Sequence, residues 1–236
     1  EFVCLGIFGP KSRDLLSKIT NEDLSNENFK FGKAKNINLN SIDVWVQRLS
    51  YVGELGYELY VQKENGKDIY DLIVETGKYY DITHCGAHTM DIMRMESGFL
   101  HWGHDISPED NQYQAGLNFT ISFKKPFDFI GKKKLLKIKD QKLDRRFVML
   151  TLKDNKPGYP LLLHEEPIYL GDKIIGKTTS GCYSFNFNKN LSFGYIKSDI
   201  DNEKLNDKKL FIEIEKKKYQ ANLLLKPLKQ NNFKII

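Results

Sequence analysis

The stretch RLSYVGELGYELYV, residues 48–61, gathers side chains that could hold a ligand. It carries two carboxylates, Glu54 and Glu58, and three tyrosines around two glycines. An ionised carboxylate accepts two adjacent donors through short, directional hydrogen bonds, and a flat aromatic ring can pack against a heterocycle. The chemistry suggested is recognition of a ligand with two neighbouring donors. The pattern alone, however, favours the simpler interpretation of a surface carboxylate.

The elements around this stretch must position Glu58. Residues 42–49 and 57–61 alternate as two strands, and the glycines of VGELG tolerate the backbone angles of a tight connection. Because successive strand side chains point to opposite faces, Glu58 shares a face with Tyr60. The other face receives Tyr57, Leu59 and Val61. We therefore predict a hairpin in which Glu58 is not a core residue.

Four histidines fall in one window: His84, His88, His101 and His104. The segment HCGAH lacks the intervening Glu of a zinc-protease helix, and Gly86 weakens any helix there. We predict no metal site and expect these histidines to cap elements or line pockets. The sequence has no GxGxxG, GxxxxGK[ST] or GxSxG motif.

Composition indicates a soluble, cytoplasmic globular protein. The 236 residues are 40% hydrophobic and 28% charged, which is enough for one large core or two modest ones. No run approaches the roughly 18 uncharged apolar residues of a membrane span, and the start lacks the features of a signal peptide. Cys4, Cys85 and Cys182 are odd in number and far apart, so we expect buried apolar fillers rather than disulfides, metal ligands or nucleophiles.

A basic run extends from Phe123 to Arg146 and holds ten Lys or Arg residues against three Asp. Apolar residues lie among the charges, and only Phe127 and Phe129 could stack on bases. We predict a solvated helix face. A patch for an anionic small-molecule tail and a nucleic-acid surface are the alternatives, and we expect no nucleic acid and no membrane among the partners.

The two halves of the chain differ in pattern. The first is mixed, with helices predicted over 12–20, 66–77 and 86–98, the last ended by Gly98 in a left-handed conformation. The second is all-β, with strands in RFVMLTL, PIYLGDKIIGKTTS, LSFGYIK, KLFIEIE and QANLLLKPL. These short segments between Gly, Asn and Asp turns predict a small antiparallel barrel or sandwich.

Several ordered motifs together resemble a known family. They are Gly53-Glu54-Leu55-Gly56-Tyr57-Glu58, Met93-Arg94-Met95-Glu96-Ser97-Gly98, Gly103-His104-Asp105 and Ala115-Gly116-Leu117, followed by DFIGKKKLL and IIGKTTSGCYSFNFNKNLSFGYI. This order is similar to the aminomethyltransferase, or glycine cleavage T-protein, superfamily. Within it, RLSYVGELGYELYV, HWG and DISPED look most like the C-terminal folate-binding part of dimethylglycine and sarcosine dehydrogenases.

The resemblance implies an α+β fold in two parts. Residues 1–125 would be the second half of a T-protein-like folate-binding domain, and residues 126–236 its C-terminal β-barrel domain. In such dehydrogenases an upstream FAD domain oxidises a methylated amine, and tetrahydrofolate captures the product as 5,10-methylenetetrahydrofolate. The family's catalytic carboxylate would lie in the absent N-terminal half, so the fragment alone is expected to be inactive. In a eukaryote the location would be the mitochondrial matrix.

The resemblance also assigns roles to residues. The family's pterin-binding Glu falls on Glu58, and Tyr51 matches a position that lines the same pocket. Trp102 is expected either to form a pocket wall or to pack in a core. Met90 stands where glycine-cleavage aminomethyltransferases carry a folate-holding Arg, which favours the dehydrogenase branch.

Four further residues receive mainly structural assignments. Glu54 is expected to act as a turn or supporting residue, and Arg48 could pair with a nearby carboxylate. Arg94 and Glu96 are expected to make a structural ion pair or cap contacts. Two other functions stay open at this point, a stand-alone tetrahydrofolate-dependent aminomethyl- or methyltransferase and a non-catalytic folate-binding module.

Overall fold

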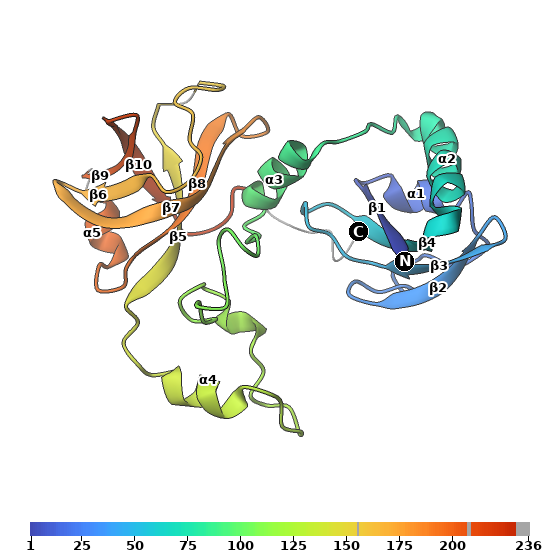
Figure 1. Ribbon diagram of the computed structural model, residues 1–236, viewed down its shortest axis with the longest axis horizontal. Helices are drawn as coiled ribbons and strands as arrows, with labels where there is room; N and C mark the ends of the chain where they lie inside the picture. The colour runs from blue at the N-terminus through green and yellow to red at the C-terminus, as the bar shows by residue number, and fades with distance from the viewer. Residues whose placement is uncertain (155, 207–208, 230–236) are drawn as a thin grey trace. The chain divides into compact units, whose positions relative to one another are not determined.

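The computed structural model describes residues 1–154, 156–206 and 209–229 of the chain. Within them the chain forms two compact units, Glu1–Ser97 together with Lys229, and Gly98–Leu228 (Figure 1). The division predicted between residues 125 and 126 concerns domains of the resembled family, whereas these units are defined by compactness. The predicted domain boundary therefore stays a prediction.

The first unit is built on a four-stranded antiparallel sheet with the order β1-β4-β3-β2. Its strands are β1 (Phe2–Phe8), β2 (Ala34–Leu39), β3 (Ile42–Gln47) and β4 (Gly56–Gln62). Its helices are α1 (Ser12–Leu16), α2 (Gly66–Gly77) and α3 (Ala87–Glu96). The β3–β4 pairing confirms the predicted hairpin.

One face of this sheet forms the core of the unit. Leu15 and Leu16 of α1 and Ile69 and Ile73 of α2 pack in one cluster with the apolar side chains of the strands. The cluster includes Tyr57, Leu59 and Val61, all at 0% exposure. The period-two pattern of β4 is thus confirmed, and Glu58 lies on the face that this core does not use.

The predicted helices differ in how well their ends were placed. The segment 66–77 is α2 over its whole predicted length. Helix α3 ends before Gly98, whose φ of +76° is the predicted left-handed conformation. Helix α1 is shorter than the predicted 12–20, because the chain turns away after Leu16. Strands β1 and β2 were not predicted from the sequence.

The expectation that the three cysteines are buried was wrong. Cys4 and Cys85 are exposed and Cys182 is half-buried, and none of them is in a disulfide within the described residues. Cys4 lies on β1, an edge strand whose alternation places its side chain on the face opposite the core. Cys85 lies in the irregular segment between α2 and α3.

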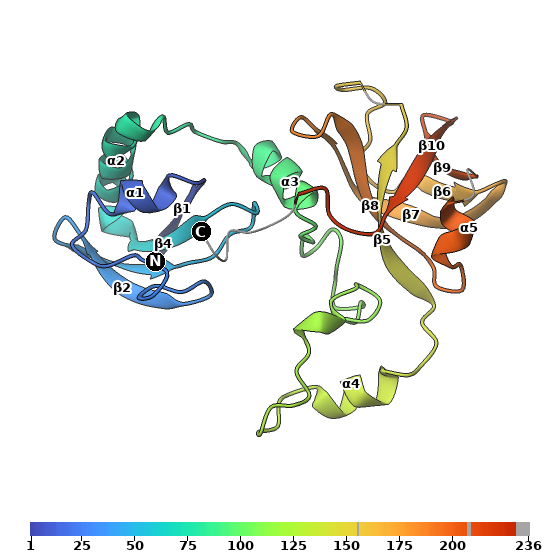
Figure 2. The same cartoon turned by 180° about the vertical axis from the view of Figure 1, so that it is seen from behind.

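The second unit contains a closed antiparallel barrel with the strand order β10-β5-β8-β7-β6-β9, seen from both sides in Figures 1 and 2. Its strands are β5 (Arg145–Leu152), β6 (Pro167–Leu170), β7 (Lys173–Ser184), β8 (Lys189–Lys197), β9 (Leu210–Ile214) and β10 (Lys217–Leu224), with α5 (Asn202–Asn206) between β8 and β9. Bulges in the β6–β7 and β7–β8 pairings allow the strands to bend. The barrel alternative of the prediction is therefore confirmed.

The basic run forms α4 (Lys132–Ile138) and its flanking loops. No residue of α4 is buried, which confirms the predicted solvated face. Lys125 lies 5.9 Å and 5.6 Å from the ring centres of Phe127 and Phe129, so these aromatic faces are engaged by a lysine. Among the described residues, no helix has both the length and the apolar character that crossing a membrane requires.

Candidate functional site

Glu58 lies on an inner strand of the first sheet. Its neighbours across the sheet are Gly6 on β1 and Gln47 on β3. The side chain is half-buried, and its Oε2 accepts a hydrogen bond of 2.9 Å from the Tyr60 hydroxyl. Among the described residues, no other group donates to this carboxylate. Gly6 adds no side chain beside it, and a Cβ at this position would come within 2.5 Å of the Phe8 ring.

A row of three side chains lies next to Glu58 on the same face. Tyr60 pairs with Cys4 on β1 and with Trp45 on β3, so the three residues align across three strands. Trp45 is 41% exposed, although most of its ring is apolar. The face is therefore a flat, partly aromatic surface with one carboxylate beside it. Such a surface suits a planar ligand with adjacent donors.

The electrostatics of this face follow from Glu58. Its hydrogen bond with Tyr60 raises the pKa of that tyrosine to about 12, with burial and the Glu58 charge adding to the effect. Burial and the Glu58 charge also raise the pKa of the Cys4 thiol, while a hydrogen bond with Tyr60 opposes them. Both groups stay protonated near neutral pH. Cys4 is therefore a poor nucleophile, and Tyr60 is a donor that holds the Glu58 carboxylate in place.

This coupling gives a first testable prediction. Glu58→Gln removes the negative charge and the charged acceptor, so the pKa of Tyr60 should fall from about 12 toward the ordinary value of about 10. Ultraviolet titration of the tyrosines to about pH 11 should then show one additional phenolate in the variant. A Glu64→Gln variant, at an exposed position outside the sheet, should titrate like wild type. Identical titrations for Glu58→Gln and wild type would contradict the coupling.

The other predicted residues of this stretch lie in the loop between β3 and β4. Tyr51 is half-buried there, and its assignment as a pocket residue stays a prediction. Glu54, also half-buried, forms an ion pair with Lys229, which ties the loop to that lysine. Arg48 is 1% exposed and donates from Nη1 to the Phe29 carbonyl at 2.7 Å. Its pairing with a carboxylate stays a prediction.

A cavity of about 550 Å³ lies along β1 in the first unit. Its walls include Leu5 and Ile7 of β1, Tyr70 of α2, and Met90 of α3. Met90 is therefore a wall residue, and the resemblance places a folate-holding arginine at this position in relatives. His84 also lines the cavity and lies 2.7 Å from the Tyr70 hydroxyl, which confirms a pocket-lining role for this histidine.

Trp102 belongs to the second unit, whereas Glu58 and Tyr51 belong to the first. Its side chain is 64% exposed, so the expectation of simple core packing was wrong. The reason is local, because Trp102 follows the left-handed Gly98 turn on an irregular segment and makes only an isolated bridge to Ile106. Its role as a pocket wall stays a prediction.

Two buried charges near the motifs are structural. Arg94 is 1% exposed and pairs with Asp91 at 2.7 Å. The ion pair or cap contacts expected of Arg94 and Glu96 stay a prediction. Asp105 is also 1% exposed. It accepts hydrogen bonds from the Thr179 and Ser180 hydroxyls of β7 and from the His101 amide. It thereby attaches the loop after α3 to the barrel.

Sequence reasoning missed the contributions of Cys4 and Trp45 to the Glu58 face. Cys4 comes from β1, whose pairing with β4 cannot be read from the local pattern because β1 precedes β4 by about fifty residues. For Trp45 a signal was available, the alternation of residues 44–47 (VWVQ). It places the Trp45 side chain on the face opposite the buried Val44 and Val46.

The fold and the motifs agree with one protein family. The profile of the GCVT N-terminal domain matches residues 1–125, and that of the glycine cleavage T-protein C-terminal barrel domain matches residues 145–229. The chain therefore belongs to the glycine cleavage T-protein family. This confirms the resemblance inferred from the sequence.

Individual relatives narrow the comparison. The chain is 36% identical over 228 residues to mitochondrial dimethylglycine dehydrogenase of Homo sapiens, covering 97% of the chain but 26% of the relative. It is 33% identical over 193 residues to mitochondrial sarcosine dehydrogenase of Mus musculus, covering 82% and 21% respectively. The crystal structure of an aminomethyltransferase of the glycine cleavage system from Bartonella henselae has the same fold, with a TM-score of 0.81 at 20% identity over 98% of this chain and 60% of that one. The chain thus spans about a quarter of the dehydrogenases it matches.

Proposed function

We propose that this chain is the tetrahydrofolate-binding part of an enzyme that demethylates dimethylglycine or sarcosine oxidatively. In this proposal an FAD domain upstream in the full-length protein oxidises the N-methyl group. Tetrahydrofolate then accepts the one-carbon unit and becomes 5,10-methylenetetrahydrofolate. The full-length protein would act in the cytoplasm, or in the mitochondrial matrix of a eukaryote.

The observation that carries the proposal is the position of Glu58. A pterin edge presents a ring N–H and an amino group side by side, and one carboxylate can accept both. Glu58 is half-buried on an open sheet face, held by the Tyr60 hydroxyl and with no side chain from Gly6 beside it. A carboxylate held in this way has lost part of its rotamer freedom before the ligand arrives, which favours tight binding.

The neighbouring aromatic side chains would add a flat surface against which the pterin ring can stack. Trp45 and Tyr60 offer aromatic surface beside Glu58, and a planar ring gains from offset stacking there. Tyr51 is proposed as a second ring against the pterin. Methionine at position 90 cannot provide the positive charge of the arginine in aminomethyltransferases, so the glutamate tail of the folate would need another cation.

The full-length protein tests the proposal. We expect it to carry flavin, to reduce that flavin with dimethylglycine or sarcosine, and to convert tetrahydrofolate to its 5,10-methylene form. The measurements are the visible absorption spectrum, flavin bleaching under anaerobic conditions, and chromatography of the folate products. A colourless protein would exclude the dehydrogenase, and release of formaldehyde at the same rate with and without tetrahydrofolate would exclude the capture step.

A further inference from the structure

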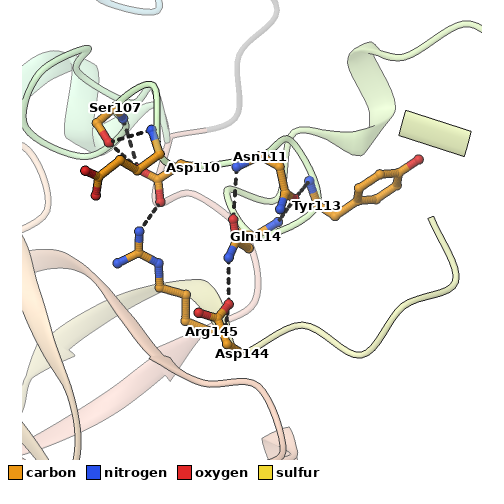
Figure 3. Close-up of polar contacts among 8 residues, drawn as sticks. Ser107, Asp110, Asn111, Tyr113, Gln114, Asp144 and Arg145 are labelled. Carbon is orange, nitrogen blue, oxygen red and sulfur yellow. Dashed lines mark hydrogen bonds and ion pairs between the residues drawn. The ribbon is translucent and has the colours of Figure 1, made fainter. Parts of the chain in front are cut away.

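A second cavity, of about 350 Å³, lies in the barrel unit and has no part in the proposed folate site. One wall is the outer surface of β7 and β8, and the opposite wall is the loop of residues 104–110. Figure 3 shows how Asp110 of this loop meets Arg145 at the start of β5. Its volume lies at the lower end of the range of about 300–1,000 Å³ that small-molecule sites occupy, so it suits a small metabolite.

A buried hydroxyl faces this cavity. Tyr195 of β8 is 6% exposed, and its ring packs edge-on against Phe147 and under the Arg145 guanidinium, 5.0 Å from the ring centre. In the part of the chain that the structure describes, neither the Tyr195 hydroxyl nor the Arg145 Nε has a hydrogen-bond partner. Buried polar groups in proteins nearly always have one. Two such groups on one cavity wall indicate a ligand that supplies the missing hydrogen-bond partners.

Two carboxylates of the loop, Asp105 and Asp110, are already engaged. Asp110 accepts from Arg145 at 2.7 Å and from the Ser107 amide and hydroxyl (Figure 3). Asp105 accepts hydrogen bonds from the hydroxyls of Thr179 and Ser180 on β7. Burial is the main cause that raises the pKa of the Tyr195 phenol, and the negative charge of Asp110 is the second. The hydroxyl therefore stays neutral and can both donate and accept a hydrogen bond.

The charges of the two walls differ in sign. The barrel wall contributes Arg145, Lys177 and Lys197, the loop contributes Asp105, Glu109 and Asp110, and Glu165 also lines the cavity. Arg145 is paired with Asp110, and Lys177 is paired with Glu165 at 2.6 Å. Among the described residues, Lys197 and Glu109 make no ion pair. The Lys197 cation therefore remains on the barrel wall and the Glu109 carboxylate on the loop, while Asp105 is held by hydroxyl and amide donors.

We infer that this cavity is a binding site for a small zwitterion of the amino-acid class. Its carboxylate would lie toward Tyr195, Arg145 and Lys197, and its ammonium toward Glu109. A ligand with one sign of charge would meet an uncompensated like charge on one of the walls. The inference is independent of the proposed folate chemistry, because none of its residues is among those proposed to bind folate.

Glycine, acetate and methylammonium are the probes that test this inference on the whole 236-residue chain. In an NMR titration to about 10 mM, glycine should shift resonances around Tyr195 and Arg145 in a saturable way, whereas acetate and methylammonium should bind much more weakly. Tyr195→Phe keeps the ring but removes the hydroxyl, and should weaken glycine about five- to tenfold. Glu109→Gln should weaken glycine toward the level of acetate.

Tyr219→Phe is the matched control, because its hydroxyl contacts Tyr159 on another part of the barrel. It should leave glycine binding unchanged. Absence of saturable shifts would overturn the inference and leave a cavity filled by water. Equal binding of acetate and glycine would overturn the zwitterion class, and shifts confined to the first unit would overturn the location.

Discussion

Replacing Glu58 with glutamine is expected to weaken tetrahydrofolate binding about 10- to 100-fold. The reason is that a carboxylate accepting two donors makes charge-assisted hydrogen bonds worth about 1.5–3 kcal/mol, whereas an amide keeps one acceptor oxygen and places an NH₂ group against a donor. The Tyr60 hydroxyl should still find the amide oxygen, so the sheet should fold normally. Isothermal titration calorimetry on the intact protein measures the effect.

The control for this prediction is Glu64→Gln, which makes the same chemical change at an exposed position outside the sheet. It should bind tetrahydrofolate with the wild-type affinity. If Glu58→Gln also binds with wild-type affinity, Glu58 is a surface carboxylate and the simpler interpretation of its strand is correct. Circular dichroism of both variants separates a loss of binding from a loss of fold.

Replacing Asp105 with alanine is expected to destabilise the barrel unit by about 3 kcal/mol or more. The carboxylate is 1% exposed and accepts from the hydroxyls of Thr179 and Ser180 at 2.5 Å and 2.8 Å. It also accepts from the His101 amide at 2.8 Å. Alanine leaves these donors without their acceptor and opens a small void.

Urea unfolding measures this effect in a Trp45→Phe background, where Trp102 is the one remaining tryptophan and lies three residues from Asp105. The unfolding midpoint should fall with little change in slope. Asp172→Ala is the matched control, since that side chain is fully exposed, and it should change the stability by less than about 0.5 kcal/mol. An unchanged midpoint for Asp105→Ala would show that the loop is not held by this carboxylate.

Local patterns predicted the parts of the fold that depend on local physics. The helix predicted over 66–77 is α2, whose Ile69 and Ile73 lie in the core, and alternation placed Glu58 on the opposite face from Leu59. Both follow from side-chain geometry within one element. The left-handed Gly98 was predictable because few other residues adopt that conformation readily.

The remaining features depend on pairing between distant segments. Strand β1 joins the sheet beside β4, so the exposure of Cys4 and its place near Glu58 could not follow from composition. Core packing was one of the two roles expected of Trp102, yet its backbone follows a turn that leads it to the surface. The Tyr195 cavity needs the loop of residues 104–110 to lie against β8, and no local pattern specifies that contact.

The closure of the barrel has a consequence for the order in which the protein forms on the ribosome. The sheet that carries Glu58 is complete once Gln62 has been made, whereas β5 acquires its second neighbour only when β10 is made, some seventy residues after it. Until then one edge of β5 can pair with strands of other chains. We therefore expect the nascent barrel, rather than the sheet that carries Glu58, to be the stage of synthesis that most needs a chaperone.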